Sequence, residues 1–187
     1  MSTALRAGPV SYLVLGIVAL RGPSTSYDLK RFVQLSVGHF WPFPHTQLYA
    51  EPARLAEAGL LEETREETGR RRRYYSITDE GRAMLSEWLT EPATEPMEYR
   101  DLGLLKLFFS ELTGTDQVHA LAVEQADAQR RQLAEYEGLL QRFADRPEFE
   151  LRLLSLKLGT RMARAAAEFW EELATEPPRT DHRRNGR

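Results

Sequence analysis

The sequence contains no cysteine among its 187 residues. Disulfide bonds, thiolate metal sites and cysteine nucleophiles are therefore excluded. Long hydrophobic runs are missing too, because the longest, Val10 to Leu20, is interrupted by Ser11 and Gly16 and falls short of the roughly 20 residues that span a bilayer. The amino terminus shows no basic leader followed by a small-residue cleavage site. We therefore expect a cytoplasmic protein that does not enter the membrane.

The motifs of common enzyme classes are also missing. The four histidines, His39, His45, His119 and His182, show no metal-ligand spacing. The sequence contains no Gly-x-Ser-x-Gly element, no phosphate-binding P-loop and no Gly-x-Gly-x-x-Gly fingerprint. We expect a protein that is not an enzyme and that uses no metal and no cofactor.

The chain has little excess charge of either sign, with a net charge of −3. Residues 1–90 hold 11 Lys and Arg against 10 Asp and Glu, whereas residues 91–187 hold 14 against 18. A chain of this kind binds a polyanion only where its positive charge is concentrated locally.

The first half of the sequence predicts helices followed by a hairpin. Apolar residues recur at helical spacing from Pro9 to Leu20, and the pattern predicts further helices after Thr25 and from Thr46 to Ala58. Strands are predicted at 60–68 and 71–78, and Thr78 would cap a helix that continues to Leu89. This order of elements is typical of a winged helix-turn-helix, which we assign to residues 1–89 as a DNA-binding domain.

The second half is predicted to be helical after a proline-containing linker at 90–97. The expected helices lie at 102–114, 115–143 and 147–174. Residues 98–176 would form a dimerisation domain, and 177–187 a disordered tail. The expected fold class is therefore mainly α (α+β), with an amino-terminal winged helix-turn-helix, a two-stranded wing and a carboxy-terminal antiparallel helical dimerisation domain.

The last predicted helix carries two apolar lines. One line, through Leu153, Thr160 and Trp170, would pack on the helix before it. The second line favours contact with another copy of the chain, and the alternative is packing against the shorter helix at 102–114. The residues predicted to form the dimer contact are Leu133, Tyr136, Leu140, Leu151, Leu154, Leu158, Met162 and Phe169.

Positive charge is concentrated in four consecutive arginines at the predicted hairpin tip: Arg70, Arg71, Arg72 and Arg73. Like charges this close repel one another, and a polyanion relieves the repulsion because guanidinium groups donate paired hydrogen bonds to phosphate. The pattern therefore favours DNA contact, with Arg70 and Arg72 on one face of the strand as the favoured pair. The alternative is a solvated hairpin balanced by Glu62, Glu63, Glu66 and Glu67 of the opposite strand.

The predicted helix at 46–58 carries side chains that suit the major groove. Gln reads adenine edges, Thr contacts a thymine methyl group or a phosphate, and Tyr binds a phosphate oxygen. Tyr49 fits the core equally well, His45 fits a helix cap, and Pro52 should kink the helix or delay its start. The candidates for DNA contact are Lys30, His45, Thr46, Gln47, Tyr49 and Arg54.

Several segments in this order resemble PadR-family transcriptional regulators. The resemblance rests on Ser26-Tyr27-Asp28-Leu29-Lys30, Phe40-Trp41-Pro42, Thr46-Gln47-Leu48-Tyr49, Arg54-Leu55, Gly59-Leu60-Leu61, Gly69-Arg70 and the run from Tyr74 to Gly81. It covers about residues 9–89, and the helical remainder looks like the long carboxy-terminal domain of the subgroup that also resembles virulence-gene activators.

The resemblance implies a homodimeric, effector-responsive repressor that binds a palindromic operator and is often released by a small aromatic effector. Carried over by position, Thr46, Gln47 and Tyr49 would lie on the recognition helix, and Arg70 on the wing. The alternative is a winged helix that binds a protein without sequence-specific DNA binding, although such a wing needs an apolar or mixed surface more than an arginine cluster.

An effector site would lie between the two domains or at the dimer interface. Aromatic side chains would stack on the effector there, although each of them also fits the core. The candidates are Trp88, Tyr99, Phe108, Phe109, Phe169 and Trp170.

Overall fold

The computed structural model describes residues 7–41, 45–67 and 71–178. The chain divides into two compact units, Met1–Glu95 and Pro96–Arg187. The expected fold class is confirmed, because helices dominate the described residues and the strands found there form one two-stranded antiparallel sheet. Within those ranges, no helix is both long enough and apolar enough to cross a membrane.

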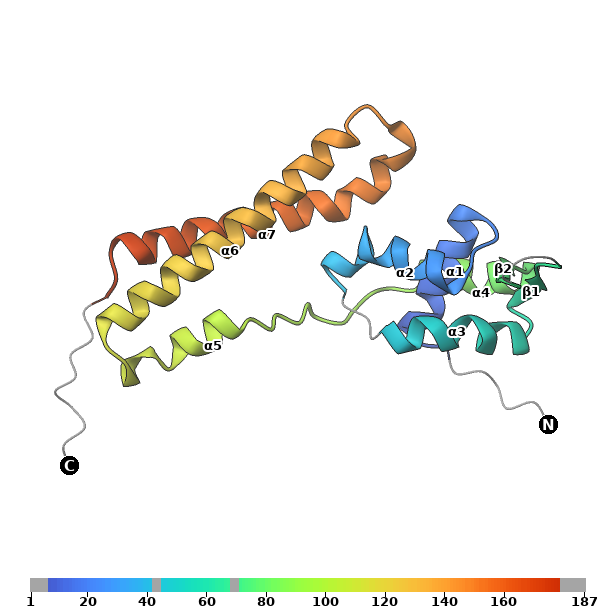
Figure 1. Ribbon diagram of the computed structural model, residues 1–187, viewed down its shortest axis with the longest axis horizontal. Helices are drawn as coiled ribbons and strands as arrows, with labels where there is room; N and C mark the ends of the chain where they lie inside the picture. Colours follow the sequence, from blue (N-terminus) through green and yellow to red (C-terminus); the bar gives the residue numbers. More distant parts are fainter. Residues whose placement is uncertain (1–6, 42–44, 68–70, 179–187) are drawn as a thin grey trace. The chain divides into compact units, whose positions relative to one another are not determined.

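In the amino-terminal unit a β-hairpin lies at the edge of a group of packed helices (Figure 1). Its elements are α1 (Pro9–Arg21), α2 (Ser26–Gln34), the 3-10 turn η1 (Val37–His39), α3 (His45–Glu57), β1 (Leu61–Arg65), β2 (Arg73–Ile77) and α4 (Asp79–Thr90). The strands pair with Leu61 opposite Ile77 and Arg65 opposite Arg73. Ser24 extends the sheet beyond β2, through two backbone hydrogen bonds with Tyr75 of 3.1 and 2.9 Å.

The ends of these elements follow from local chemistry. The Thr25 hydroxyl caps α2 by accepting the backbone N–H of Asp28 at 3.2 Å, and the Asp28 carboxylate accepts the Thr25 N–H at 3.0 Å. Thr78 caps α4 by accepting the Gly81 N–H at 3.1 Å. Gly59, with φ of +78°, adopts the left-handed conformation that ends α3.

Pro52 does not delay the start of α3, so that part of the expectation is wrong. The helix runs without a break from His45 to Glu57, with Pro52 inside it. The proline ring is fully buried on the same face as Leu48 and Leu55, which belong to the core. Burial of this apolar face helps to offset the hydrogen bond that the proline nitrogen cannot donate.

Every α-helix and both strands of the unit contribute to one core. Leu29 comes from α2, Leu61 and Tyr75 come from the hairpin, and Leu85 comes from α4. The full set is Val14, Leu15, Ile17, Val18, Leu29, Val33, Leu48, Leu55, Leu61, Tyr75 and Leu85. This core holds α3 and the hairpin in fixed positions within the unit.

The carboxy-terminal unit is a long helical hairpin with a short helix packed on it (Figure 1). Its elements are α5 (Leu102–Phe108), η2 (Ser110–Leu112), α6 (Thr115–Arg142), η3 (Pro147–Phe149) and α7 (Glu150–Thr175). Ion pairs from Arg130 to Glu171 and from Arg164 to Glu137 show that α6 and α7 run antiparallel. The predicted line on α7 does face α6, because Thr160, Ala163, Ala167 and Trp170 are buried.

Three residues of α6 that were predicted to contact another chain face α7 of the same chain. Tyr136 is only 4% exposed, and its ring lies against Gly159 of α7, where an added β-carbon would come within 3.3 Å of it. Leu133 and Leu140 are half-buried on the same line of α6. We therefore assign Leu133, Tyr136 and Leu140 to the contact between α6 and α7, because α6 turns this line toward its own chain.

Candidate nucleic-acid interface

The helix α3 presents a polar face outside the core. Thr46, Gln47 and Ala50 are exposed, and Tyr49 is 48% exposed, whereas Leu48 is fully buried. Of the two interpretations of Tyr49, the structure therefore supports the surface position. The side chain of His45 lies outside the described residues. The exposed face combines an amide, a hydroxyl and a phenol, which are groups that bind base edges and phosphates.

The end of the hairpin carries three described arginines, Arg71, Arg72 and Arg73, all exposed. Arg71 has φ of +49°, and the turn is closed by a 3.0 Å hydrogen bond from the Glu66 N–H to the Arg72 carbonyl. Arg70, the fourth candidate, lies outside the described residues. In the part of the chain that the structure describes, neither Arg71 nor Arg72 forms an ion pair.

Glu63 pairs with two arginines at the base of the wing, Arg65 and Arg73. Its carboxylate accepts a 2.9 Å hydrogen bond from Arg65, pairs with Arg73 at 3.5 Å and accepts the Tyr75 hydroxyl at 3.3 Å. The hydrogen bond from Arg65 and the charge of Arg73 hold the pKa of Glu63 below its usual value. The predicted balance by glutamates thus applies to Arg73, whereas Arg71 and Arg72 form no ion pair within the described residues.

The start of α2 carries the carboxylate of Asp28, which belongs to the cap of the helix. Hydrogen bonds from Thr25 lower the pKa of Asp28, and the charges of Arg21 and Arg72 lower it further. Lys30, another candidate, is half-buried in the middle of the same helix.

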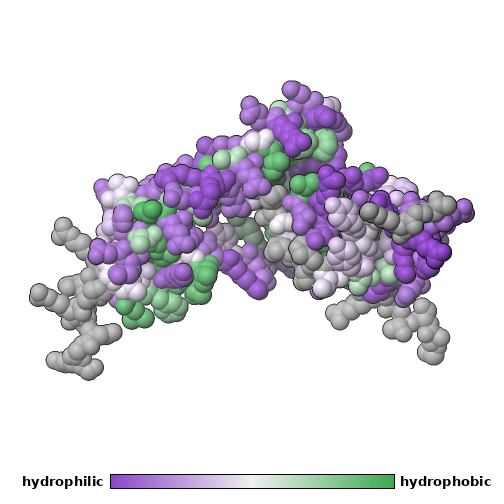
Figure 2. Space-filling model, viewed as in Figure 1, coloured by the Kyte–Doolittle hydropathy of each residue, from purple (hydrophilic) through white to green (hydrophobic). Residues whose placement is uncertain are grey.

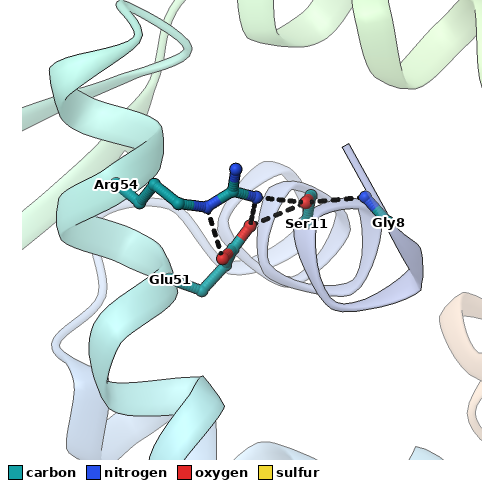
Figure 3. Close-up of polar contacts among 4 residues, drawn as sticks. All are labelled: Gly8, Ser11, Glu51 and Arg54. Atoms are coloured by element: carbon teal, nitrogen blue, oxygen red, sulfur yellow. Dashed lines mark hydrogen bonds and ion pairs between the residues drawn. The ribbon is translucent and has the colours of Figure 1, made fainter. Parts of the chain in front are cut away.

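Arg54 forms hydrogen bonds within the amino-terminal unit (Figure 3). Its Nε donates to Glu51 at 2.9 Å, and one terminal nitrogen donates to Glu51 at 2.5 Å and to Ser11 of α1 at 3.0 Å. Two of the three guanidinium nitrogens therefore hold a contact between α3 and α1, whereas the side chain is 41% exposed, so Arg54 stays a candidate for DNA contact. The sequence analysis did not identify Ser11 or Glu51. The spacing of Glu51 and Arg54 is visible in the sequence, but their contact with Ser11 on another helix is not.

The aromatic residues predicted to bind an effector differ in their burial. Trp170 is 1% exposed and packs with Ala122 and Ala126, so it belongs to the core of the carboxy-terminal unit. Trp88 stacks on Tyr12 within the amino-terminal unit, with 4.5 Å between ring centroids. The remaining candidates are exposed: Tyr99, Phe108, Phe109 and Phe169. Two described hollows, at the end of α7 and at the turn between α6 and α7, are lined by none of them.

Two protein families match consecutive parts of the chain. Residues 14–87 match the transcriptional regulator PadR-like family, and residues 99–176 match the virulence activator alpha C-terminal family. The curated negative transcriptional regulator PadR of Bacillus subtilis (strain 168) is 25% identical over 131 residues, which are 69% of this chain and 71% of that protein. Residues 14–87 therefore form a PadR-like domain, a domain of transcriptional regulators.

Solved structures of the PadR family share the fold. The crystal structure of Bacillus subtilis PadR with operator DNA matches 89% of this chain and 97% of that chain, with a TM-score of 0.79 and 22% identity. The same regulator with p-coumaric acid gives a TM-score of 0.72 at 23% identity, over 89% of this chain and 96% of that chain. The structure of the Vibrio cholerae virulence activator AphA gives a TM-score of 0.68 at 24% identity, over 89% of this chain and 96% of that chain.

The family and the geometry agree on the class of function. The PadR-like domain covers α3 and the wing, where the exposed polar and cationic side chains lie. The chain is a DNA-binding regulator with a PadR-like domain, and the homologues that it matches are transcriptional regulators rather than enzymes.

Proposed function

We propose that the chain binds a palindromic operator as a homodimer, with α3 of each copy in the major groove and the wing on the adjacent phosphates. The observation that carries this proposal is the exposed row of Thr46, Gln47 and Tyr49 on a helix whose opposite face is core. The major groove admits an α-helix and shows a distinct pattern for every base pair. Arg71 and Arg72 would add affinity that does not depend on sequence.

The exposed apolar side chains of the carboxy-terminal unit support pairing of two copies. Leu151, Leu154 and Leu158 are 81, 54 and 58% exposed along α7, Met162 is half-buried, and Phe169 is 44% exposed. These exposed fractions show that α5 does not cover the line. Apolar side chains also gather at the surface around α5 (Figure 2). Proteins rarely leave such patches in water unless a partner covers them, and a second copy is the simplest partner.

We also propose that the regulator represses transcription and responds to a small aromatic acid. The relative at 25% identity is a negative regulator, which supports repression, and the p-coumaric acid bound to Bacillus subtilis PadR suggests the class of effector. In this chain Tyr99, Phe108 and Phe109 are exposed and would stack on the effector, whereas Phe169 is assigned to the proposed dimer contact.

Selection of bound sequences from a random duplex pool tests the operator proposal. The wild-type chain should enrich an inverted repeat and bind it with two chains per duplex. Gln47→Ala should lose roughly 1–3 kcal/mol of discrimination at one base pair of each half-site, because one base contact is removed. An enriched motif without symmetry, or no enrichment, contradicts the proposal.

A reporter gene placed behind the selected motif tests the direction of regulation and the effector. Expression should fall when the chain is present and should recover when p-coumaric acid is added. Increased expression contradicts repression. Unchanged expression with p-coumaric acid, together with unchanged intrinsic fluorescence of the purified chain, contradicts this class of effector.

A further inference from the structure

The recognition helix α3 is tied to the first turn of α1 by a closed set of hydrogen bonds (Figure 3). The Ser11 hydroxyl donates to Glu51 at 2.6 Å and accepts from Arg54 at 3.0 Å and from the Gly8 N–H at 3.0 Å. A hydroxyl offers one donor and two acceptor positions, so all three are used. Ser11 is 1% exposed and cannot reach DNA itself.

These bonds lie where α3 cannot stabilise itself fully. Pro52 stands between Glu51 and Arg54 and has no N–H to donate to the carbonyl of Leu48 one turn earlier. The apolar face of the helix resists separation from the core, but apolar contact is not directional and tolerates a small roll about the helix axis. Hydrogen bonds depend steeply on angle, and therefore fix the roll.

The roll of α3 determines where Gln47 points. Gln47, Glu51 and Arg54 follow one another at spacings of four and three, so they share one stripe along the helix. Glu51 is held by two partners, because its carboxylate receives Arg54 at two oxygens and Ser11 at one. Side chains that bind a partner must be held to within about 0.5 Å of their binding geometry, and hydrogen bonds from supporting residues provide this precision.

We propose that Ser11 and Glu51 are positioning residues that set the roll of the recognition helix and thereby the base preference of the regulator. This inference rests on the proposed function of α3. It assigns specificity to a buried serine on another helix, which makes no contact with the groove. The affinity for DNA of any sequence, which comes from phosphate contacts, does not depend on the pair.

The test compares Ser11→Ala with Ser24→Ala in the full chain. Ser24 is also a buried serine of the same unit, 3% exposed, and its hydroxyl bonds only locally, to the Gly22 carbonyl at 2.9 Å. Each variant is taken through the random-duplex selection, and its affinities for the wild-type motif and for a scrambled duplex are measured. Glu51→Gln provides a second route, because it keeps the size of the side chain and removes the charge that holds Arg54.

Ser11→Ala and Glu51→Gln should each lower the ratio of the two affinities by roughly tenfold, the size of one base contact. Their affinity for the scrambled duplex should stay within about twofold of wild type. Ser24→Ala should keep the wild-type ratio. A wild-type ratio in Ser11→Ala and Glu51→Gln, even with reduced thermal stability, overturns the inference alone. If the wild-type chain itself enriches no motif, the proposed function and this inference both fail.

Discussion

Gly81 at the start of α4 lies directly against the backbone of Leu60, so that a β-carbon on Gly81 would come within 2.1 Å of the Leu60 carbonyl oxygen. The same oxygen accepts the Thr78 N–H at 3.2 Å, and the Thr78 hydroxyl donates to the Gly59 carbonyl at 2.8 Å. The end of α3, both strands of the wing and the start of α4 therefore meet at one point. Close contact there fixes the wing relative to the recognition helix.

Gly81→Ala should destabilise the amino-terminal unit by about 1–3 kcal/mol, because the added carbon forces two backbone segments apart. Urea denaturation at one protein concentration measures the change. Gly16→Ala is the matched control, since a β-carbon on Gly16 in α1 meets no atom within 4 Å. That control should be neutral or up to about 1 kcal/mol more stable, because alanine favours helix. Equal stability of the two variants would contradict the close approach.

The two wing arginines without a described ion pair should control the salt dependence of DNA binding. For Arg71→Ala and Arg72→Ala we expect the slope of log affinity against log salt to flatten by about 0.9 each, the value for one phosphate contact. Arg73→Ala should change the slope less, because Glu63 already neutralises that side chain. Arg146→Ala, which removes the same charge from the turn between α6 and α7, serves as the control. An equal change in Arg146→Ala would mean that net charge, rather than the wing, is responsible.

A charge placed on the exposed line of α7 should separate the proposed dimer. Leu154→Glu and Leu158→Glu each bring a carboxylate into the apolar contact, where burial of an unpaired charge is strongly unfavourable. Sedimentation equilibrium should show monomers for both variants and dimers for the wild type. Lys157→Glu is the control, since Lys157 lies beside a hollow at the turn between α6 and α7. Dimers that persist in both leucine variants would move the interface elsewhere.

Glu51 should make part of the stability sensitive to acid. Burial alone would raise the pKa of its carboxyl, but hydrogen bonds from Arg54 and Ser11 outweigh burial and hold the pKa below the usual value. A lowered pKa stabilises the folded state fully above the unfolded-state pKa of about 4.3, and the contribution is lost as pH falls through the lower folded-state pKa.

The free energy of unfolding, measured by urea denaturation between about pH 3 and pH 6, should therefore fall at the acid end. The fall should be shallower for Glu51→Gln, which has no carboxyl to protonate. Parallel pH profiles for wild type and variant would show that the network does not depend on the charge of Glu51.

Local signals in the sequence predicted most of the fold. The helical spacing after Pro9, the cap at Thr78 and the strand-favouring residues around Tyr75 all involve neighbouring residues, and the structure has these elements. Pro52 misled the prediction because the missing hydrogen bond is visible in the sequence, whereas the burial of its ring against the core is not.

The candidate site depended more on distant contacts. The sequence indicates that Arg54 suits a DNA contact, but it does not show that Arg54 also contacts Ser11, 43 positions earlier. The spacing of Leu133, Tyr136 and Leu140 fitted either another chain or α7, and the pattern alone did not distinguish the two. Gly159 on α7, against which the Tyr136 ring packs, is the feature that separates them, and it is 23 positions away in the sequence.

Protection of guanine N7 from dimethyl sulfate on the selected duplex tests the central claim most directly, because N7 lies in the major groove. With two copies of α3 in place, we expect two protected patches, related by the symmetry of the site and separated by whole helical turns of about 10 base pairs. Gln47→Ala should reduce protection within both patches. A single protected patch, or binding without any protection of N7, would contradict recognition of the operator by paired α3 helices.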